Sequence, residues 1–457
     1  MRKNLLFLLF LFAFPALAWA QDVITLEEAC DLARQHSPQV EAQRHSVEAA
    51  EAQLTQATYY WTPKLSFRSE FGPMPKVTDL KSTVDDVWDY IANSWGFTMR
   101  NYLDFWIPLF TSTKVYNTRE LAKIGLKVEE LRVENEILNV EYDVSRAYIG
   151  LQLAIAAGDV LQEAEDYVQR IQDGYDKLRE EAEENEDGES SVKETDQYRI
   201  DIARTHLGRL RNDVAAKRNY AEHALAIHTG LSLPIRVEEM NFDRDPVVLK
   251  KAEEIQELAH QYRGDLKLLE QSVAAADLRA HIEWLNWWPD LVLGGQVYYK
   301  YSNAVPKLDP AVENFYYSDG NNAHGFTMGF ILTWNVDPVR QAFRVREMNA
   351  QAERTRTQRD LAIAGIDLEV LSEYQTTANC LANIELTYQS RRAAKRILTQ
   401  EMLNYEAGTG DVDAMIAALR AYIEQRSMYL QALHDFRVAL VKLQKVTGVM
   451  RTSDLLE

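Results

Sequence analysis

The stretch VENEILNVEYDVSRAYIGLQLA, residues 133–154, constrains the fold more than any other part of the sequence. Its apolar side chains recur at alternating spacings of four and three residues: Val133, Ile137, Val140, Val144, Ala147, Leu151 and Ala154. Such a repeat of about 3.5 residues is typical of a left-handed coiled coil. Residues 111–179 contain no proline and only isolated glycines, so we expect one helix of roughly 100 Å. A helix of this length is longer than an ordinary globular domain.

A second apolar stripe follows the same helix on another face. It consists of Leu121, Ile124, Leu131 and Leu138. A two-stranded coiled coil uses one such seam and leaves the remaining faces charged. Two seams favour helical neighbours on both sides, which predicts a closed ring of helices.

Four segments outside the helices alternate apolar and polar side chains with a period of two. They cover about residues 64–75, 95–108, 290–302 and 325–336. Their length suits tilted transmembrane strands, which need roughly 9–11 residues. Aromatic residues crowd their ends, as in interfacial girdles: Tyr59, Tyr60, Trp61, Trp95, Trp106, Trp284, Trp287, Trp288 and Trp334. A soluble hairpin with one buried face would show the same alternation, so the strands alone leave both interpretations open.

The sequence contains an internal duplication. Ser46-Val47-Glu48-Ala49-Ala50 recurs as Ser272-Val273-Ala274-Ala275-Ala276, an offset of 226 residues (272 minus 46). Pro63 and Tyr148 are matched at the same offset by Pro289 and Tyr374. We therefore expect a first structural repeat over residues 21–233, a linker over 234–250, a second repeat over 251–450 and a C-terminal tail over 451–457.

The first twenty residues have the features of an export signal. Arg2 and Lys3 precede an apolar run from residue 5 to 14, and Ala18-Trp19-Ala20 supplies a small-residue cleavage site. The run is shorter than the roughly 20 residues of a spanning helix, and we find no later apolar stretch near that length. A membrane-spanning part must then consist of strands.

Composition argues against several functional classes. The formal net charge of −19 disfavours nucleic acid as a partner, because phosphate binding requires a concentrated basic surface. Cys30 and Cys380 are too few for a disulfide framework, which leaves two free thiols or one bridge. The sequence shows neither catalytic triad spacing nor a glycine-rich phosphate loop, and His223 and His228 are not spaced as a helical ligand pair. We expect no enzyme activity, no cofactor and no metal site.

Duplicated units of helix, hairpin and long helix behind an export signal resemble the TolC family of outer-membrane efflux proteins. The resemblance covers about residues 24–450 and depends on four short motifs. These are Trp61-Thr62-Pro63-Lys64-Leu65, Trp288-Pro289-Asp290-Leu291, Ile107-Pro108-Leu109-Phe110 and Tyr405-Glu406-Ala407-Gly408-Thr409. Pro63, Pro289 and Pro108 are accordingly expected to mark helix-to-strand junctions.

The resemblance implies a mainly helical fold with a transmembrane β part, assembled as a homotrimer. Each protomer would add four strands to a shared twelve-stranded outer-membrane β-barrel, and its long helices to a periplasmic α-barrel. Four strands leave two unpaired edges, which lipid does not tolerate, so the physical argument also requires other copies. The family further implies an exit duct of a tripartite efflux or type I secretion system, working with a periplasmic adaptor and an inner-membrane transporter.

The turns between paired long helices are expected to form the pore aperture and the adaptor contact. The residues are Tyr405, Gly408, Gly410, Asp411 and Asp413 at the second turn, and Asp187 and Gly188 at the first. Asp411 and Asp413 would either form a carboxylate ring that selects cations or cap the following helix. The acidic run over residues 180–189 departs from the family's short turn and is either a solvated loop or a docking surface for a basic adaptor.

The main alternative is a periplasmic coiled-coil adaptor or scaffold without a membrane-spanning part. Such a scaffold would be released with the periplasm, whereas an outer-membrane duct requires detergent and migrates as a trimer. The alternating hairpins in both repeats favour the duct, and the sequence does not specify its substrate.

Overall fold

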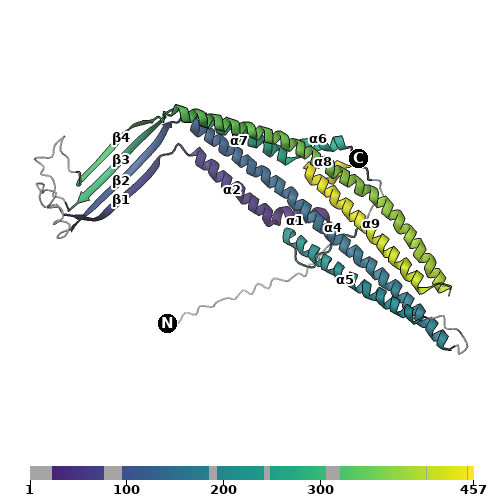
Figure 1. Ribbon diagram of the computed structural model, residues 1–457. Coiled ribbons are helices and arrows are strands. Elements are labelled where there is room, and N and C mark those ends of the chain that lie inside the picture. The colour runs from purple at the N-terminus through teal and green to yellow at the C-terminus, as the bar shows by residue number, and fades with distance from the viewer. Residues whose placement is uncertain are drawn as a thin grey trace, which may run out of the picture. The chain divides into compact units, whose positions relative to one another are not determined.

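The computed structural model describes residues 23–76, 95–184, 193–240, 247–304, 320–407, 409–449 and 451–456. The expected export signal, and the site residues Asp187, Gly188 and Gly408, lie outside these ranges. The order of elements is α1 (Leu26–His36), α2 (Pro38–Thr58), β1 (Lys64–Pro75), β2 (Trp95–Phe110), α4 (Lys114–Glu184), α5 (Glu194–Thr229), α6 (Ala252–Tyr262), α7 (Gly264–Leu285), β3 (Asp290–Ser302), β4 (Ala323–Thr333), α8 (Pro338–Glu406), α9 (Val412–Thr447) and the short 3₁₀ helix η1 (Thr452–Leu455) (Figure 1).

The chain divides into two compact units, each made of discontinuous segments. One contains Met1–Arg44, Arg132–Asp265 and Ala364–Glu457, and we call it the helical unit. The other contains His45–Leu131 and Leu266–Ile363, and we call it the sheet unit because all four strands belong to it.

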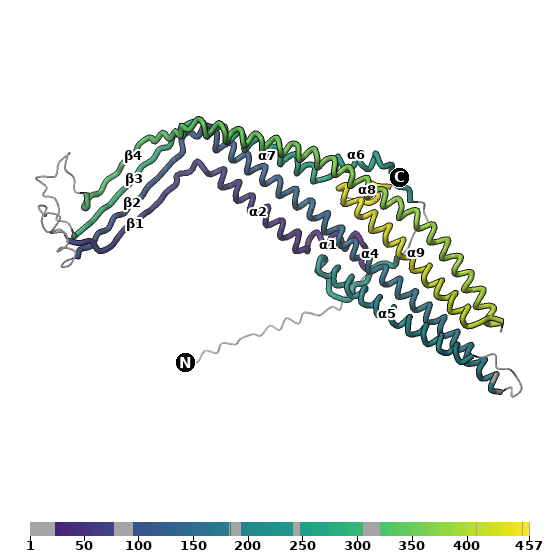
Figure 2. Tube along the Cα trace, viewed as in Figure 1, coloured from purple at the N-terminus to yellow at the C-terminus, as the bar shows by residue number. Residues whose placement is uncertain are grey.

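The sheet unit contains one antiparallel sheet with the strand order β1-β2-β3-β4 (Figure 2). Its registers place most of the apolar side chains of the four strands on one face, which we call the apolar face. One row across the sheet, for example, is Phe67, Leu103, Val297 and Phe326. Phe67 is 69% exposed and Phe326 59% exposed, so this apolar face is open in the protomer. Among the described strand residues, the apolar face carries no Asp, Glu, Lys or Arg.

The helical unit holds the buried core. One cluster packs Val140, Val144 and Leu151 of α4 against α1 and α5, so these three members of the predicted heptad stripe are buried. A second cluster joins α4 and α5 to the ends of α8 and α9 around Tyr405, Met415 and Leu419. The single helix predicted over residues 111–179 is confirmed by α4.

The part of α4 over Lys114–Glu181 is also, among the described residues, the one helix long and apolar enough to cross a membrane by length and composition. Half of its most apolar window is buried inside the protein. The sequence inspection missed this window because charged residues interrupt it. A buried core helix meets the same criterion, so this observation gives little support for a helical span.

Local capping agrees with the sequence at the start of the first repeat. Thr25 caps α1 in a capping box, in which Glu28 N donates to Thr25 Oγ1 at 3.2 Å and Thr25 N donates to Glu28 Oε2 at 2.9 Å. Pro38 is the first residue of α2, where a missing N–H costs nothing. Cys30 and Cys380 are both free.

Two strand boundaries differ from expectation. Strand β2 continues through Pro108 to Phe110, and its register against β3 shifts between these two residues. Pro108 is therefore inside a strand and not at a junction. Pro108 has no backbone N–H to donate to a neighbouring strand. The register shift against β3 and the end of pairing with β1 at Trp106 allow it to lie within β2. Strand β4 ends at Thr333, and Trp334 instead donates its Nε1–H to Trp287 O at 3.0 Å.

Candidate functional site

Tyr405 lies near the end of α8 with its ring buried against α4. The side chain is 8% exposed, and its hydroxyl donates to Ile171 O at 3.3 Å. A Cβ on Gly174 would lie 2.6 Å from Tyr405 Cε1, so a glycine on α4 allows the ring to approach. Burial, together with the nearby Asp196 and Asp176, raises the pKa of Tyr405 to about 12. Tyr405 thus joins two long helices and does not present its ring to an aperture in the protomer.

The turn after Tyr405 is tight. Thr409 N donates to Asn404 O at 3.0 Å, which brings the chain back toward the end of α8. At Gly410, a Cβ would lie 2.6 Å from Tyr405 N. Glycine at position 410 therefore allows α9 to begin directly at Val412.

The two aspartates of this turn have different surroundings. Asp411 occupies the N-cap position of α9, but its exposed side chain makes no capping hydrogen bond. The Oδ1 atom of Asp413 lies 3.5 Å from Arg199 Nε on α5. Arg199 Nη1 also donates to Asp196 Oδ1 at 3.4 Å, and Asp196 is buried. We call Asp196, Arg199 and Asp413 the ion-pair cluster; it links α5 to α9, whereas Asp411 faces solvent.

Two of the three expected junction prolines stand directly before strands. Pro63 precedes β1 and Pro289 precedes β3. Ser112 Oγ donates to Pro289 O at 3.2 Å, and Lys114 Nζ lies 2.9 Å from Asp290 Oδ1. These contacts join the first turn of α4 to the start of β3 and fix where strand becomes helix.

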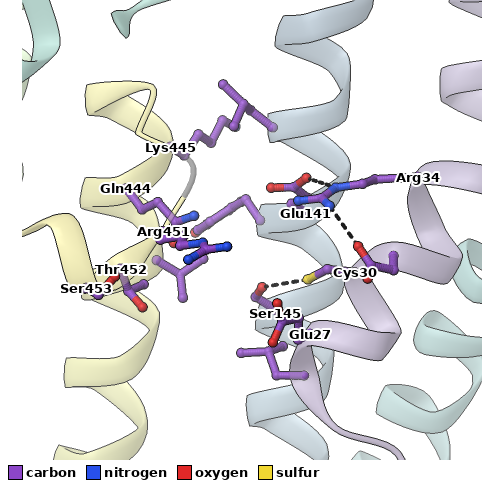
Figure 3. A pocket seen from close by; sticks show the side chains of 15 residues that line it. Glu27, Cys30, Arg34, Glu141, Ser145, Gln444, Lys445, Arg451, Thr452 and Ser453 are labelled. Carbon is purple, nitrogen blue, oxygen red and sulfur yellow. Dashed lines mark hydrogen bonds and ion pairs between the residues drawn. The ribbon is translucent and has the colours of Figure 1, made fainter.

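A cavity of about 630 Å³ lies among α1, α4, α9 and residues 451–453 in the helical unit (Figure 3). On one wall Arg34 pairs with Glu141, and Cys30 Sγ lies 3.6 Å from Ser145 Oγ. Gln444, Lys445 and Arg451 line the facing wall. Burial raises the pKa of the Cys30 thiol, which makes it a poor nucleophile. Charges of both signs line this cavity, without an arrangement typical of catalysis.

The Arg34–Glu141 pair has a counterpart in the second repeat. At the offset of 226 residues, Arg34 corresponds to His260 and Glu141 to Asp367. His260 Nε2 lies 2.8 Å from Asp367 Oδ1. Ion pairs thus join α1 to α4 and α6 to α8 at positions that correspond under the expected duplication.

Among the described residues, no group of three or more His, Cys, Asp and Glu side chains is arranged to hold a metal ion. Arg199 and Lys114 were not identified from the sequence. The only local signal for Arg199 is its spacing of three residues from Asp196, and its contact with Asp413 depends on tertiary structure.

Comparisons with known proteins agree with this architecture. Residues 29–181 match the family model described as outer membrane efflux protein. The sequence matches no curated protein significantly. The outer-membrane channel OprN has a TM-score of 0.70 at 14% identity, over 93% of this chain and 89% of that one. The Campylobacter jejuni outer membrane channel CmeC has a TM-score of 0.70 at 15% identity, over 96% and 92%.

The Neisseria gonorrhoeae outer membrane channel MtrE, solved in its open state, has a TM-score of 0.68 at 14% identity, over 93% of this chain and 88% of that one. At such identities these similarities establish the fold. The chain therefore has the fold of these outer-membrane channels, and its residues 29–181 resemble the outer membrane efflux protein family.

Proposed function

We propose that the chain is one protomer of a trimeric outer-membrane channel, the exit duct of a tripartite efflux or type I secretion system. The observation that carries this proposal is the sheet. Its apolar face is exposed on Phe71 and Phe330, each 73%, and is free of charged residues along the described strands. A soluble protomer would have to cover that face, whereas a barrel turns it toward lipid.

The edges of the sheet give a second argument. Strands β1 and β4 are the outer strands, so each has one side without a partner in the protomer. Unpaired backbone groups are too costly in lipid, and closure into a barrel removes them. Pairing β1 of one copy with β4 of the next would close the sheet, and the twelve strands of the family correspond to three copies.

The helices would then form the periplasmic extension. In this arrangement the turn around Gly410 and Asp411 meets the adaptor and narrows the pore, and the ion-pair cluster holds α9 against α5 in the closed state. The adaptor would couple the duct to an inner-membrane transporter that supplies the energy. The buried Tyr405 supports the turn from inside.

Fractionation and electrical recording test the proposal. The mature protein should remain with the outer membrane after salt and carbonate washes, dissolve in detergent as a particle of three chains, and form pores in planar bilayers. A periplasmic scaffold would instead be released as a soluble protein and would leave the bilayer current unchanged. That second result would refute the duct.

A further inference from the structure

The face of the sheet opposite the apolar one carries three cations in two neighbouring rows. The register places Arg100 on β2 directly opposite Glu70 on β1 and Lys300 on β3. The neighbouring row contains Arg68, Tyr102 and Tyr298. Because side chains alternate between faces, these residues share the polar face. We call Arg68, Arg100 and Lys300 the cationic belt.

Contacts within the belt confirm that its side chains share this face. The guanidinium of Arg68 lies 4.8 Å from the centroid of the Tyr102 ring. Lys300 Nζ lies 5.1 Å from the Tyr298 centroid and 6.0 Å from that of Tyr102. The rings accept the cations on their faces without neutralising them.

Carboxylates compensate the belt only in part. Within these two rows Glu70 is the sole acidic residue, at 3.4 Å from Arg68 Nε, so three cations and one anion leave a net charge of +2. Asp104 belongs to the next row and accepts a hydrogen bond from Gln296 Nε2 at 2.6 Å. Three copies would place six net positive charges around one circumference, in a chain whose formal net charge is −19.

Stability does not account for this arrangement. Arg100 and Lys300 are directly opposite across β2 and β3, and like charges at such positions destabilise a sheet. Features that oppose local stability are often those that a protein keeps for function. Arg100 and Lys300 lie nearer the strand ends at Trp95 and Ser302, whereas Arg68 lies nearer the start of β1.

We propose that the cationic belt lines the lumen and binds polyanionic solutes, so that the β part of the duct favours anions. The inference rests on the proposed function, because the polar face lines a lumen only if the sheet closes with its apolar face toward lipid. The belt is distinct from the acidic turn around Asp411.

The test uses inorganic tripolyphosphate as the probe, added to the barrel side of trimers in planar bilayers. Wild-type current should be blocked in a voltage-dependent way. The double variant Arg100→Gln/Lys300→Gln removes six charges from the trimer and should weaken the block by roughly tenfold or more, as expected for several screened charges acting together. A matched control, Lys395→Gln/Arg396→Gln on α8, removes the same charge from exposed positions and should leave the block unchanged.

A charge-preserving variant separates charge from side-chain shape. The double variant Arg100→Lys/Lys300→Arg should be blocked by tripolyphosphate as strongly as the wild type. If Arg100→Gln/Lys300→Gln does not assemble, the single variant Lys300→Gln takes its place, and its block should be weaker than that of the wild type. Equal block in the wild type and in every Gln variant that conducts normally would refute the proposed anion binding by the cationic belt. It would not affect the proposal that the protein is an outer-membrane channel. An absence of pores in the wild type would instead count against the proposed function.

Discussion

The ion-pair cluster allows a direct test of the proposal that the turn around Asp413 is held closed by contacts between α5 and α9. The substitution Asp413→Asn keeps the shape of the side chain and removes the charge that lies 3.5 Å from Arg199. The contact between Arg199 and the buried Asp196 remains, so no charged group loses its last partner. We expect the variant to fold and to open more readily.

The size of the expected effect follows from the solvent exposure of the paired side chains. The side chains of Arg199 and Asp413 are 41% and 60% exposed, so solvent screens the pair and each contact contributes about 0.5 kcal/mol. Three protomers that open together would lose about 1.5 kcal/mol of closed-state stability. At 25 °C this corresponds to roughly a tenfold shift toward the open state.

The assay is the open probability of single trimers in planar bilayers at low ionic strength. Asp411→Asn is the control, because it removes one negative charge only two residues from Asp413, and the Asp411 side chain makes no capping hydrogen bond. It should alter block by cations and leave the open probability unchanged. In 1 M salt, where the screening length falls to about 3 Å, wild type and Asp413→Asn should converge. Equal open probabilities for wild type and Asp413→Asn at low salt would refute the reasoning.

Three further outcomes are expected. Phe330→Arg should destabilise the membrane-inserted trimer by about 2–4 kcal/mol per protomer, whereas Thr327→Arg on the polar face should change its stability little. Denaturant titration of the reconstituted protein measures both effects. Equal destabilisation by the two variants would contradict the assignment of the faces. Gly174→Ala should cost about 1–3 kcal/mol in thermal unfolding, because the new methyl group meets the Tyr405 ring; an unchanged melting temperature would show that the ring moves aside. The pKa of Tyr405 rises from 10.0 to about 12 on folding, so the stability that its protonated hydroxyl contributes is complete below pH 10 and is lost as the pH rises toward 12. Tyr405→Phe should therefore reduce the loss of folding stability at alkaline pH. An identical loss in the wild type and the variant would exclude Tyr405 as its cause.

Features set by local pattern could be predicted from the sequence. Leu65, Phe67 and Phe71 alternate with polar residues, and the structure places them on one face of β1 because a strand has a period of two. The long helix α4 was predictable because no proline interrupts it. The capping box at Thr25 needs only two residues three positions apart.

Features set by tertiary contact could not be predicted. Arg199 and Asp413 are far apart in the sequence, and nothing local identifies which carboxylate the guanidinium meets. The burial of the Tyr405 ring above Gly174 also depends on tertiary packing that no local pattern indicates. Pro108 was taken as a strand end, and only the register against β3 shows how β2 continues through it. The aperture and adaptor-contact assignments stay predictions for all seven residues: Tyr405, Gly408, Gly410, Asp411, Asp413, Asp187 and Gly188.

The open sides of β1 and β4 have a consequence for biogenesis. If the sheet closes with other copies as proposed, a lone subunit would leave these edges unpaired in a bilayer, and insertion and oligomerisation would proceed as one coupled reaction. Its yield then depends steeply on local subunit concentration, because stability and protomer concentration are inseparable in an obligate oligomer. Cells that make the subunit slowly would need to hold it in a protected form until enough copies have gathered to close the ring.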